Sequence, residues 1–387
     1  MLLDEARRSY RPRQELYAEL RAASPLLNER NNEWVLSRYS HVREACRNFS
    51  NVAKSAECPI RRRDSSPESR EVFYGLFRLQ MDNQDEPYHS DVRCHLRVLS
   101  ETKFLEHTRP FVADQVGKLF AAVKEKGEVD FVKSIAQPLP EIVLRHVFGL
   151  DERAYHDLSC AADAVLSQLE CDSQRLSEAR AEQFVELVVA CVSGPLIPGS
   201  LFDRLRQSEA LGRLGKTELS ANVLLLLGAG RDTVTNLLGN MTLALLCWPH
   251  ELERMSRDPS HIGAVIEETL RFDSPIQSIK RSTHSGTIVG GVEIPKGSVV
   301  NLLVGAANLD PDVFEHAERF DPQSRRPHLA FGVGGHHCIG AALARLQATV
   351  VALQLPGLLG SMCLAAPVRR RQGVGFSALE ALHLRRV

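Results

Sequence analysis

The longest helical pattern in the chain runs from Thr217 to Trp248, about 32 residues. At a rise of 1.5 Å per residue, a helix of this length spans roughly 48 Å, more than the width of a small domain. The run from Val223 to Leu227 is apolar on every side, so we expect the helix to pass through the middle of the protein. Thr217 can cap its start and Pro249 is expected to end it. A chain built around such a helix is predicted to be mainly helical.

The sequence Ala229-Gly230-Arg231-Asp232-Thr233 interrupts this apolar helix. Glycine weakens a helix by about 1 kcal/mol relative to alanine, and a buried charge without a partner costs several times more. We therefore interpret this segment as a functional break, where a group comes close to the backbone or the helix opens locally.

A glycine-rich turn carries a cysteine in the stretch Phe331 to Gly340, FGVGGHHCIG. The segment from Ile339 to Leu355 is apolar at helical spacing and Pro356 is expected to close it, so Cys338 is predicted to lie at a helix start. Unpaired N–H groups and the helix dipole at such a position lower the pKa of a thiol. A thiolate held in this way is a good axial ligand for haem iron.

Three other interpretations of this stretch were considered. A lone cysteine can be a small buried apolar side chain. A zinc site is excluded because the adjacent residues His336, His337 and Cys338 cannot reach one tetrahedral ion together, and the chain has no C-x-x-C partner. A dinucleotide site is disfavoured because the third glycine of G-x-G-x-x-G is missing.

Composition excludes several classes of function. The net charge of −1 and 25% charged residues lack the basic excess of nucleic-acid-binding proteins. The sequence has no signal peptide and no run of roughly 20 apolar residues, so we expect a cytoplasmic protein without a membrane span. Nine cysteines without paired spacing are expected to be reduced thiols.

The cysteine stretch resembles the ligand loop of the cytochrome P450 family, F-G-x-G-x-H-x-C-x-G, at every fixed position. The Ala229 to Thr233 segment resembles the oxygen-activation motif of the same family. The resemblance extends from about Leu16 to the end, and implies a single domain over 1–387. The implied fold is mainly α with a small β-sheet region, with haem between the long central helix and the cysteine loop.

The resemblance implies haem b with Cys338 as the axial ligand of the iron. His89 and Arg93, four residues apart on one predicted helix, and Arg281 correspond to the residues that bind the haem propionates. The other implied cofactor-binding residues are Phe331, Gly332, His336, Gly340, Ala229 and Gly230. Carried over by position, Thr233 would hydrogen-bond dioxygen, and Asp232 would relay protons from solvent.

The family also implies residues for substrate binding and for structural support. The residues expected to line the substrate pocket are Leu225, Ala229, Ile276, Gln277, Ile279 and Phe376. All but Gln277 are apolar, so we expect a hydrophobic substrate that Gln277 helps to orient. Glu268 and Arg271 can pair on one helix face, and Arg319 matches the third residue of this structural group. Leu309 departs from the family, where an arginine is usual.

The expected function is a soluble haem-thiolate monooxygenase that oxidises a hydrophobic small molecule, with secondary metabolism as the expected context. No flavin, nicotinamide or iron–sulfur motif occurs in the chain, so electrons from NAD(P)H are expected through a ferredoxin or flavodoxin and its reductase. A basic surface with Arg93, Arg97 and the residues around His337 is the predicted dock. Phenol coupling, desaturation, peroxide-driven oxidation and a non-catalytic haem-binding or recruitment role remain as alternatives. The segment from Lys54 to Asp82 is predicted to be a loop that forms a wall or lid.

Overall fold

The computed structural model describes residues 1–387 except 51–70, 168–173, 208–213, 324–325, 372 and 374. The contacts divide the chain into two units, which we describe separately. Unit 1 comprises Met1–Phe49, Leu105–Pro140 and Asp232–Val387, and unit 2 comprises Ser50–Phe104 and Glu141–Arg231. Residues 54–70 of the predicted loop lie outside the described residues.

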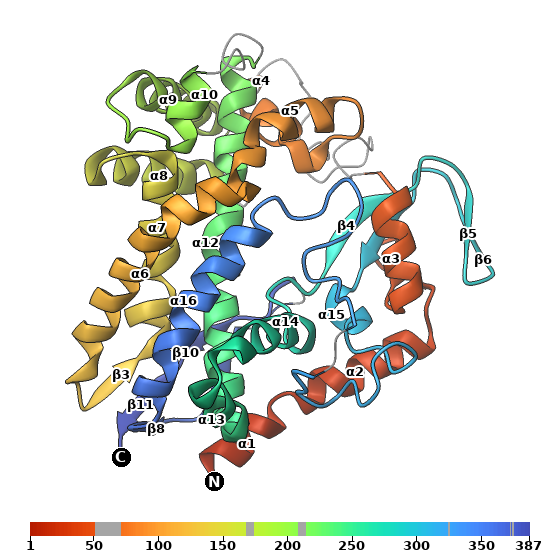
Figure 1. The fold of residues 1–387 in the computed structure, drawn as a ribbon. Coiled ribbons are helices and arrows are strands. Elements are labelled where there is room, and N and C mark those ends of the chain that lie inside the picture. Colours follow the sequence, from red (N-terminus) through yellow and green to blue (C-terminus); the bar gives the residue numbers. More distant parts are fainter. Residues whose placement is uncertain (51–70, 168–173, 208–213, 324–325, 372, 374) are drawn as a thin grey trace. The chain divides into compact units, whose positions relative to one another are not determined.

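Unit 1 contains most of the strands and many of the helices (Figure 1). Its helices are α1 (Leu2–Arg8), α2 (Arg11–Ala22), α3 (Tyr39–Asn48), most of α6 (Thr102–Lys124), α13 (Pro249–Arg257), α14 (Ile262–Phe272), α15 (Val304–Ala307) and α16 (Ala341–Leu359), with the short helices η5 (Val132–Ala136) and η7 (Pro259–His261). Its strands are β1 (Leu26–Asn28), β2 (Glu33–Leu36), β3 (Glu128–Asp130), β4 (Ile279–Ser282), β5 (Thr287–Val289), β6 (Val292–Ile294), β7 (Val299–Leu302), β8 (Met362–Leu364), β9 (Arg369–Arg370), β10 (Leu379–Ala381) and β11 (His383–Arg386).

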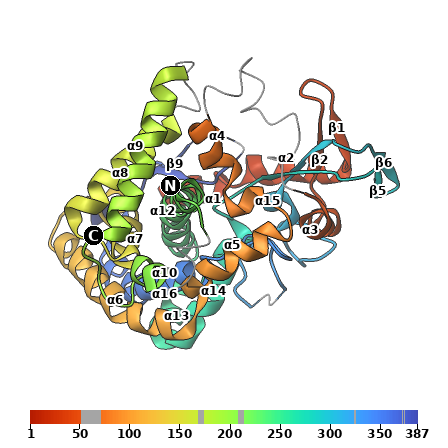
Figure 2. The same ribbon diagram turned by 90° about the horizontal axis from the view of Figure 1, so that it is seen from above.

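The main sheet of unit 1 has the strand order β1-β2-β7-β4. The β2 and β7 strands are parallel and the outer pairs are antiparallel. This sheet, α2, α3 and α15 lie together in both ribbon views (Figures 1 and 2). The inner faces of these elements bury an apolar cluster that includes Leu36, Val42, Val300, Leu302 and Phe314. This cluster joins residues of the segments 36–46 and 289–329 in one core.

Glycine and proline mark the ends of two local elements of unit 1. A turn at Gly290 and Gly291 joins β5 to β6, and both glycines have positive φ angles, 56° and 81°. The prediction for Pro356 was wrong, because α16 includes Pro356 and continues to Leu359. Residues of α16 face the protein interior along much of its length, so packing holds the last turn together despite the missing N–H.

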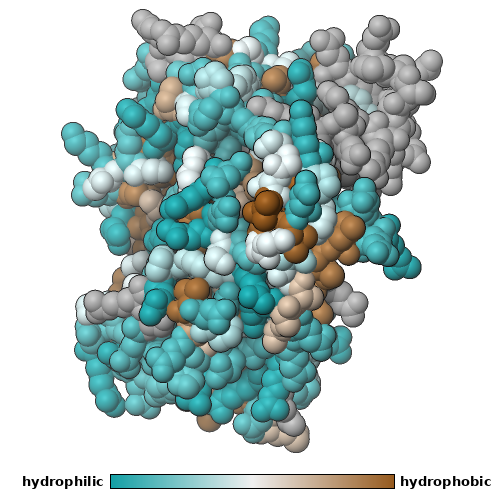
Figure 3. All heavy atoms as spheres, turned by 90° about the vertical axis from the view of Figure 1, so that its right-hand side faces the viewer, coloured by the Kyte–Doolittle hydropathy of each residue, from teal (hydrophilic) through white to brown (hydrophobic). Residues whose placement is uncertain are grey.

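The helix α16 is the one described segment that is long and apolar enough to cross a membrane. About 56% of its most apolar window is buried inside the protein, as in the core helix of a soluble protein. On the side of α3 and the β5–β6 hairpin, Figure 3 shows a mostly hydrophilic surface with small apolar patches among the described residues.

Unit 2 is helical in its described residues. Its elements are α4 (Glu71–Arg78), η3 (Met81–Asn83), α5 (Tyr88–Leu96), η4 (Arg97–Ser100), most of α7 (Pro138–Phe148), α8 (Glu152–Leu166), α9 (Gln174–Ser193), α10 (Leu201–Gln207) and the first half of α12 (Lys216–Cys247). The described residues between 151 and 193 form α8 and α9. The loop prediction was wrong for α4, because Phe73, Leu76 and Phe77 are buried and form its apolar face.

The long helix α12 is continuous, with no opening at the glycines. A Cβ atom at Gly230 would lie 3.1 Å from the Leu144 side chain, so close packing against α7 explains the glycine instead. The helix begins at Lys216, and the Glu218 carboxylate accepts a hydrogen bond from the N–H of Gly215 at 3.1 Å. Thr217 therefore lies inside the helix and is not its cap. The helix ends at Cys247, and Pro249 begins α13.

Candidate functional site

The Cys338 loop of unit 1 is closed by its own backbone. The N–H of Cys338 donates to the carbonyl of Phe331 at 2.8 Å, and the N–H of Gly332 donates to Leu329 at 2.8 Å. Gly332 and Gly334 have φ angles of 67° and 83°, in the region that favours glycine. The loop therefore turns where only glycine turns without strain.

The position of Cys338 relative to the helix differs from the prediction. Helix α16 begins at Ala341 with Gly340 as its N-terminal flanking residue, so Cys338 lies in the preceding turn. Its own N–H is bound within the loop and does not point out of a helix end. Gly340 has a φ of −86°, so it is not needed for a positive φ angle.

The thiol of Cys338 is exposed, whereas those of Cys46 and Cys247 are buried. Burial raises the pKa of Cys46, and it raises that of Cys247 to about 11, so both behave as inert apolar side chains. Within the described residues no cluster of three or more His, Cys, Asp or Glu side chains could hold a metal ion. Cys94 and Cys160 are exposed as well, but neither follows a glycine turn. An exposed sulfur behind such a turn fits the axial ligand of haem, and a lone sulfur does not fit a zinc site.

Three side chains around the loop were missed by the sequence analysis. Glu267 of α14 binds Arg345 of α16 through two hydrogen bonds of 2.7 and 2.8 Å, and lies 3.2 Å from Nε2 of His328. Although burial raises it, these hydrogen bonds bring the pKa of Glu267 down to about 2. The guanidinium of Arg345 lies 4.5 Å from the centre of the Phe331 ring. In the sequence, Arg271 is the one basic residue within one helical turn of Glu267, at i+4, but in the structure Arg271 binds Glu268 and Glu267 binds Arg345.

The Glu268 and Arg271 side chains form the pair that their spacing indicates, at 2.6 and 2.8 Å. Arg271 also donates to the carbonyls of Asn308, Ala317 and Arg319. The expectation for Arg319 needs correction, because its side chain is 70% exposed and pairs with its neighbour Glu318. Arg319 thus contacts Arg271 through its backbone carbonyl and not through its side chain. The Arg319 side chain can therefore extend into solvent.

The predicted pocket residues of unit 1 lie on both sides of a short backbone bridge. Ile276 pairs with Phe376 in an isolated antiparallel bridge, and Phe376 is 50% exposed. Ile279 lies on β4 and packs against the apolar cluster of unit 1. Arg281 lies on the same strand and its guanidinium donates to the carbonyl of Lys280 at 2.8 Å. The bridge brings Ile276 and Phe376 together, and their role in lining a substrate pocket stays a prediction.

The role predicted for Gln277 is contradicted. Its side chain is 3% exposed, its carbonyl accepts a hydrogen bond from the hydroxyl of Tyr17, and its amide donates to Ser274 at 2.5 Å. A Cβ atom at Gly305 would clash with it at 2.1 Å. Gln277 therefore faces the interior of unit 1 and binds α2, so it is not available to orient a substrate.

The two predicted propionate ligands of unit 2 share helix α5. His89 is 2% exposed, and its Nδ1 lies 3.1 Å from the Glu86 carboxylate. Arg93 is partly buried one helical turn further on. The contact with Glu86 fixes the Nδ1 side of the His89 ring.

The predicted oxygen-activation residues lie on α12. Leu225, Ala229 and Thr233 follow one another at four-residue spacing, which places them along one side of the helix. Leu225 and Thr233 are partly exposed, and Ala229 and Asp232 are exposed. A solvent-exposed carboxylate beside a partly buried hydroxyl is an arrangement that can pass a proton inward.

The charge of Arg231 is balanced inside unit 2. Its guanidinium binds Asp163 of α8 by two hydrogen bonds, lies 3.0 Å from Ser159, and forms an ion pair of 3.4 Å with Glu141. Burial opposes the charge, but the bonds to Asp163 and the charge of Glu141 raise the pKa of Arg231. A charge inside an apolar helix needs a partner, but no spacing rule identifies Asp163, which lies 68 residues away in the sequence.

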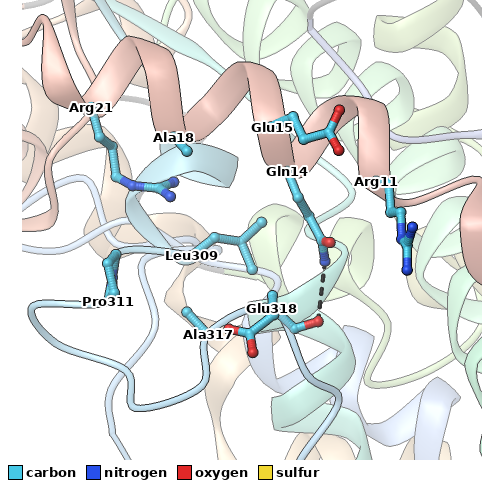
Figure 4. Close-up of a pocket in the computed structure, with 9 residues that line it drawn as sticks. All are labelled: Arg11, Gln14, Glu15, Ala18, Arg21, Leu309, Pro311, Ala317 and Glu318. Atoms are coloured by element: carbon cyan, nitrogen blue, oxygen red, sulfur yellow. Dashed lines mark hydrogen bonds between the residues drawn. The ribbon is translucent and has the colours of Figure 1, made fainter.

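A groove of about 330 Å³ lies on unit 1 between α2 and the 309–318 segment (Figure 4). The residues that line it include Arg11, Glu15, Leu309 and Glu318. The side-chain amide of Gln14 donates to the carbonyl of Glu318 at 3.2 Å. None of the predicted cofactor or substrate residues line this groove. Leu309, the departure noted above, is buried there as an apolar side chain.

Comparisons with known proteins agree on one family. Residues 261–355 match the family Cytochrome P450. The chain is 32% identical to Cytochrome P450 107B1 of Saccharopolyspora erythraea over 99% of this chain and 95% of that protein. It is 30% identical to 6-deoxyerythronolide B hydroxylase of the same species, over 88% of this chain and 87% of that protein.

Solved structures have the same fold. The structure of P450BioI in complex with an acyl carrier protein ligated to hexadec-9Z-enoic acid matches with a TM-score of 0.84 and 27% identity, over 98% of this chain and 99% of that chain. The structure of PksS, from the bacillaene polyketide synthase of Bacillus subtilis, matches with a TM-score of 0.83 at 24% identity, over 97% of each chain.

Proposed function

This chain belongs to the cytochrome P450 family, and we propose that it uses the monooxygenase chemistry of that family to oxidise a hydrophobic small molecule. The observation that carries the proposal is the exposed Cys338 thiol on a loop closed by the Phe331 carbonyl. Both units belong to one P450 domain over 1–387 in this proposal, and the protein acts in the cytoplasm.

The residues present fit haem b. Cys338 would ligate the iron, with Phe331, Gly332, His336 and Gly340 on the same loop beside it. His89 and Arg93 of unit 2 and Arg281 of unit 1 would bind the propionates, because each is a donor suited to a carboxylate. Ala229 would face the cofactor, whereas the space beside Gly230 is filled by the Leu144 side chain. When bound, haem supplies the oxidising power that inserts one oxygen atom of O2 into a C–H bond.

Asp232 and Thr233 handle the protons in this proposal. The Asp232 carboxylate is exposed and takes a proton from solvent, and the Thr233 hydroxyl holds a proton at the partly buried next position. Retention of both residues favours dioxygen over peroxide as the oxidant. Electrons from NAD(P)H would come from a ferredoxin or flavodoxin and its reductase, with Arg93 and Arg97 of unit 2 and His337 of unit 1 as docking residues.

A hydrophobic substrate follows from the predicted lining of the pocket. Once Gln277 is excluded, all the predicted lining residues are apolar: Leu225, Ala229, Ile276, Ile279 and Phe376. One relative is named for hydroxylating 6-deoxyerythronolide B, and one solved relative holds a long apolar acyl chain. Both support a hydrophobic substrate, and the first supports a role in secondary metabolism.

The experiment is a titration of the haem-loaded protein with hexadec-9Z-enoic acid, using citrate as a small, highly charged control. The proposal predicts a spin-state shift of the haem spectrum with the first compound and none with the second. A shift with citrate alone would contradict a hydrophobic pocket. With a substrate found in this way, Thr233→Ala is expected to consume NAD(P)H without forming product, and full coupling in that variant would argue for another proton route.

A further inference from the structure

Two adjacent glutamates of α14 bind two different parts of unit 1. Glu268 accepts from Arg271 and from the N–H of Asp321 at 2.7 Å, which ties α14 to the 308–321 segment. Glu267 accepts from Arg345 of α16, and its other contact is His328. Glu267 therefore contacts the two segments on either side of the Cys338 loop: α16, which follows the loop, and the residues around His328, which precede it.

The contact with His328 has a defined direction. The N–H of Ala330 donates to Nδ1 of His328 at 3.2 Å, so Nδ1 is an acceptor and the proton lies on Nε2. Nε2 therefore donates to the Glu267 carboxylate at 3.2 Å. The Glu267 carboxylate thus accepts three hydrogen bonds, two from Arg345 and one from His328. These two side chains hold the carboxylate in position from different sides.

The contact with Arg345 continues to the cysteine. The Arg345 guanidinium lies over the Phe331 ring at 4.5 Å, a cation–π contact in which planar arginine is favoured. The Phe331 carbonyl accepts the hydrogen bond from the N–H of Cys338 at 2.8 Å. A continuous series of contacts thus runs from the Glu267 carboxylate through Arg345 and Phe331 to the backbone of Cys338.

We propose that Glu267 and Arg345 are positioning residues that fix the Cys338 thiolate for iron ligation, by clamping His328 and Phe331 at the start of its loop. The inference depends on the proposed function, because it concerns the ligand role of Cys338. The hydrogen bonds with Glu267 raise the pKa of Arg345 although burial lowers it, so the guanidinium that contacts Phe331 carries its full positive charge.

The test uses the haem-loaded protein and its variants Glu267→Gln and Arg345→Lys. Glutamine keeps the size of the side chain but removes the charge, and lysine keeps the charge but loses the two-pronged hydrogen bonding and the planar contact with Phe331. Glu253→Gln is the matched control, because Glu253 forms an exposed pair with Arg257 on α13. The dithionite-reduced, carbon-monoxide-bound spectrum reports the share of protein with thiolate ligation, and the reduction potential of the haem reports the charge on the ligand.

We expect both variants to show a several-fold larger share of the form that has lost thiolate ligation, and a shifted potential, with the control unchanged. Wild-type spectra and potentials in folded Glu267→Gln and Arg345→Lys would overturn the inference while leaving Cys338 as the ligand. If the wild-type protein itself lacked the red-shifted thiolate band, the proposed function would fail and this inference with it. Should Glu267→Gln not fold, Arg345→Lys decides the question, since it keeps the ion pair with Glu267.

Discussion

The guanidinium of Arg271 binds both carboxylate oxygens of Glu268, and both side chains are almost fully buried, at 4% and 1% exposure. The same guanidinium donates to three backbone carbonyls of the 308–319 segment. One arginine thus satisfies a buried carboxylate and the backbone of a segment that has no regular helix or strand. This pair holds the segment between α15 and the Cys338 loop in place.

Replacing Arg271 with methionine should be among the most destabilising single changes in unit 1. It leaves a buried carboxylate and three carbonyls without their donor, and breaking a buried pair in this way costs about 3–5 kcal/mol. Urea unfolding followed by circular dichroism measures the loss. Arg257→Met is the control, because the Arg257 side chain is 82% exposed and its loss should change stability by less than about 0.5 kcal/mol. Equal stabilities of the two variants would refute the structural role of Arg271.

Tyr17→Phe should destabilise the protein by about 1–3 kcal/mol, because it leaves the buried Gln277 carbonyl without a donor. Adding Gln277→Met in the same chain should cost less than the sum of the single changes, since the two residues share one hydrogen bond. Strictly additive free energies of unfolding would show that the bond between α2 and Gln277 contributes nothing.

The stability contributed by Glu267 should depend on pH in a defined direction. Its pKa falls from 4.5 to about 2 in the folded protein, so its contribution is complete above pH 4.5 and is lost as the pH falls toward 2. The difference in unfolding free energy between the wild-type protein and Glu267→Gln should therefore be larger at about pH 7 than at about pH 3.5. A difference that stayed constant or grew on acidification would contradict this assignment.

The Arg231 contacts should stabilise unit 2 modestly. Asp163 is 58% exposed and Glu141 is 38% exposed, so solvent screens both partners of the 16% exposed arginine. Arg231→Met is expected to cost about 1 kcal/mol, and Asp163→Asn should cost little more once Arg231 has been replaced. A double-mutant cycle by urea unfolding gives the coupling, and a coupling of zero would mean that α8 and α12 are held together without this ion pair.

Local signals in the sequence were sufficient for much of the secondary structure. Helical spacing predicted α12 and α16, because apolar side chains recur along each of these segments. The prediction failed at α4, a short helix with Gly75 in its middle. A Cβ at Gly75 would lie 3.0 Å from the Thr217 side chain, so this glycine permits close packing that the local pattern does not reveal.

Contacts between distant parts of the chain explain why the candidate site was only partly predictable. The motif placed Cys338 and the pair Glu268 and Arg271, since their positions depend on neighbouring residues. The partner of Gln277 is 260 residues away and that of Glu267 is 78 residues away, so no spacing rule could identify Tyr17 or Arg345. Arg319 stands at the position expected for the third member of the Glu268 and Arg271 group, but its backbone carbonyl and not its side chain binds Arg271. Any residue has such a carbonyl, so the sequence does not reveal this contact.

The most direct test of the account is the absorption spectrum of the dithionite-reduced, carbon-monoxide-bound protein, measured for the wild type and for Cys338→Ala. Thiolate ligation by Cys338 predicts a strongly red-shifted Soret band in the wild type that the substitution abolishes. A Soret band typical of histidine-ligated haem in the wild type, or a red-shifted band that survives the loss of Cys338, would contradict the central claim.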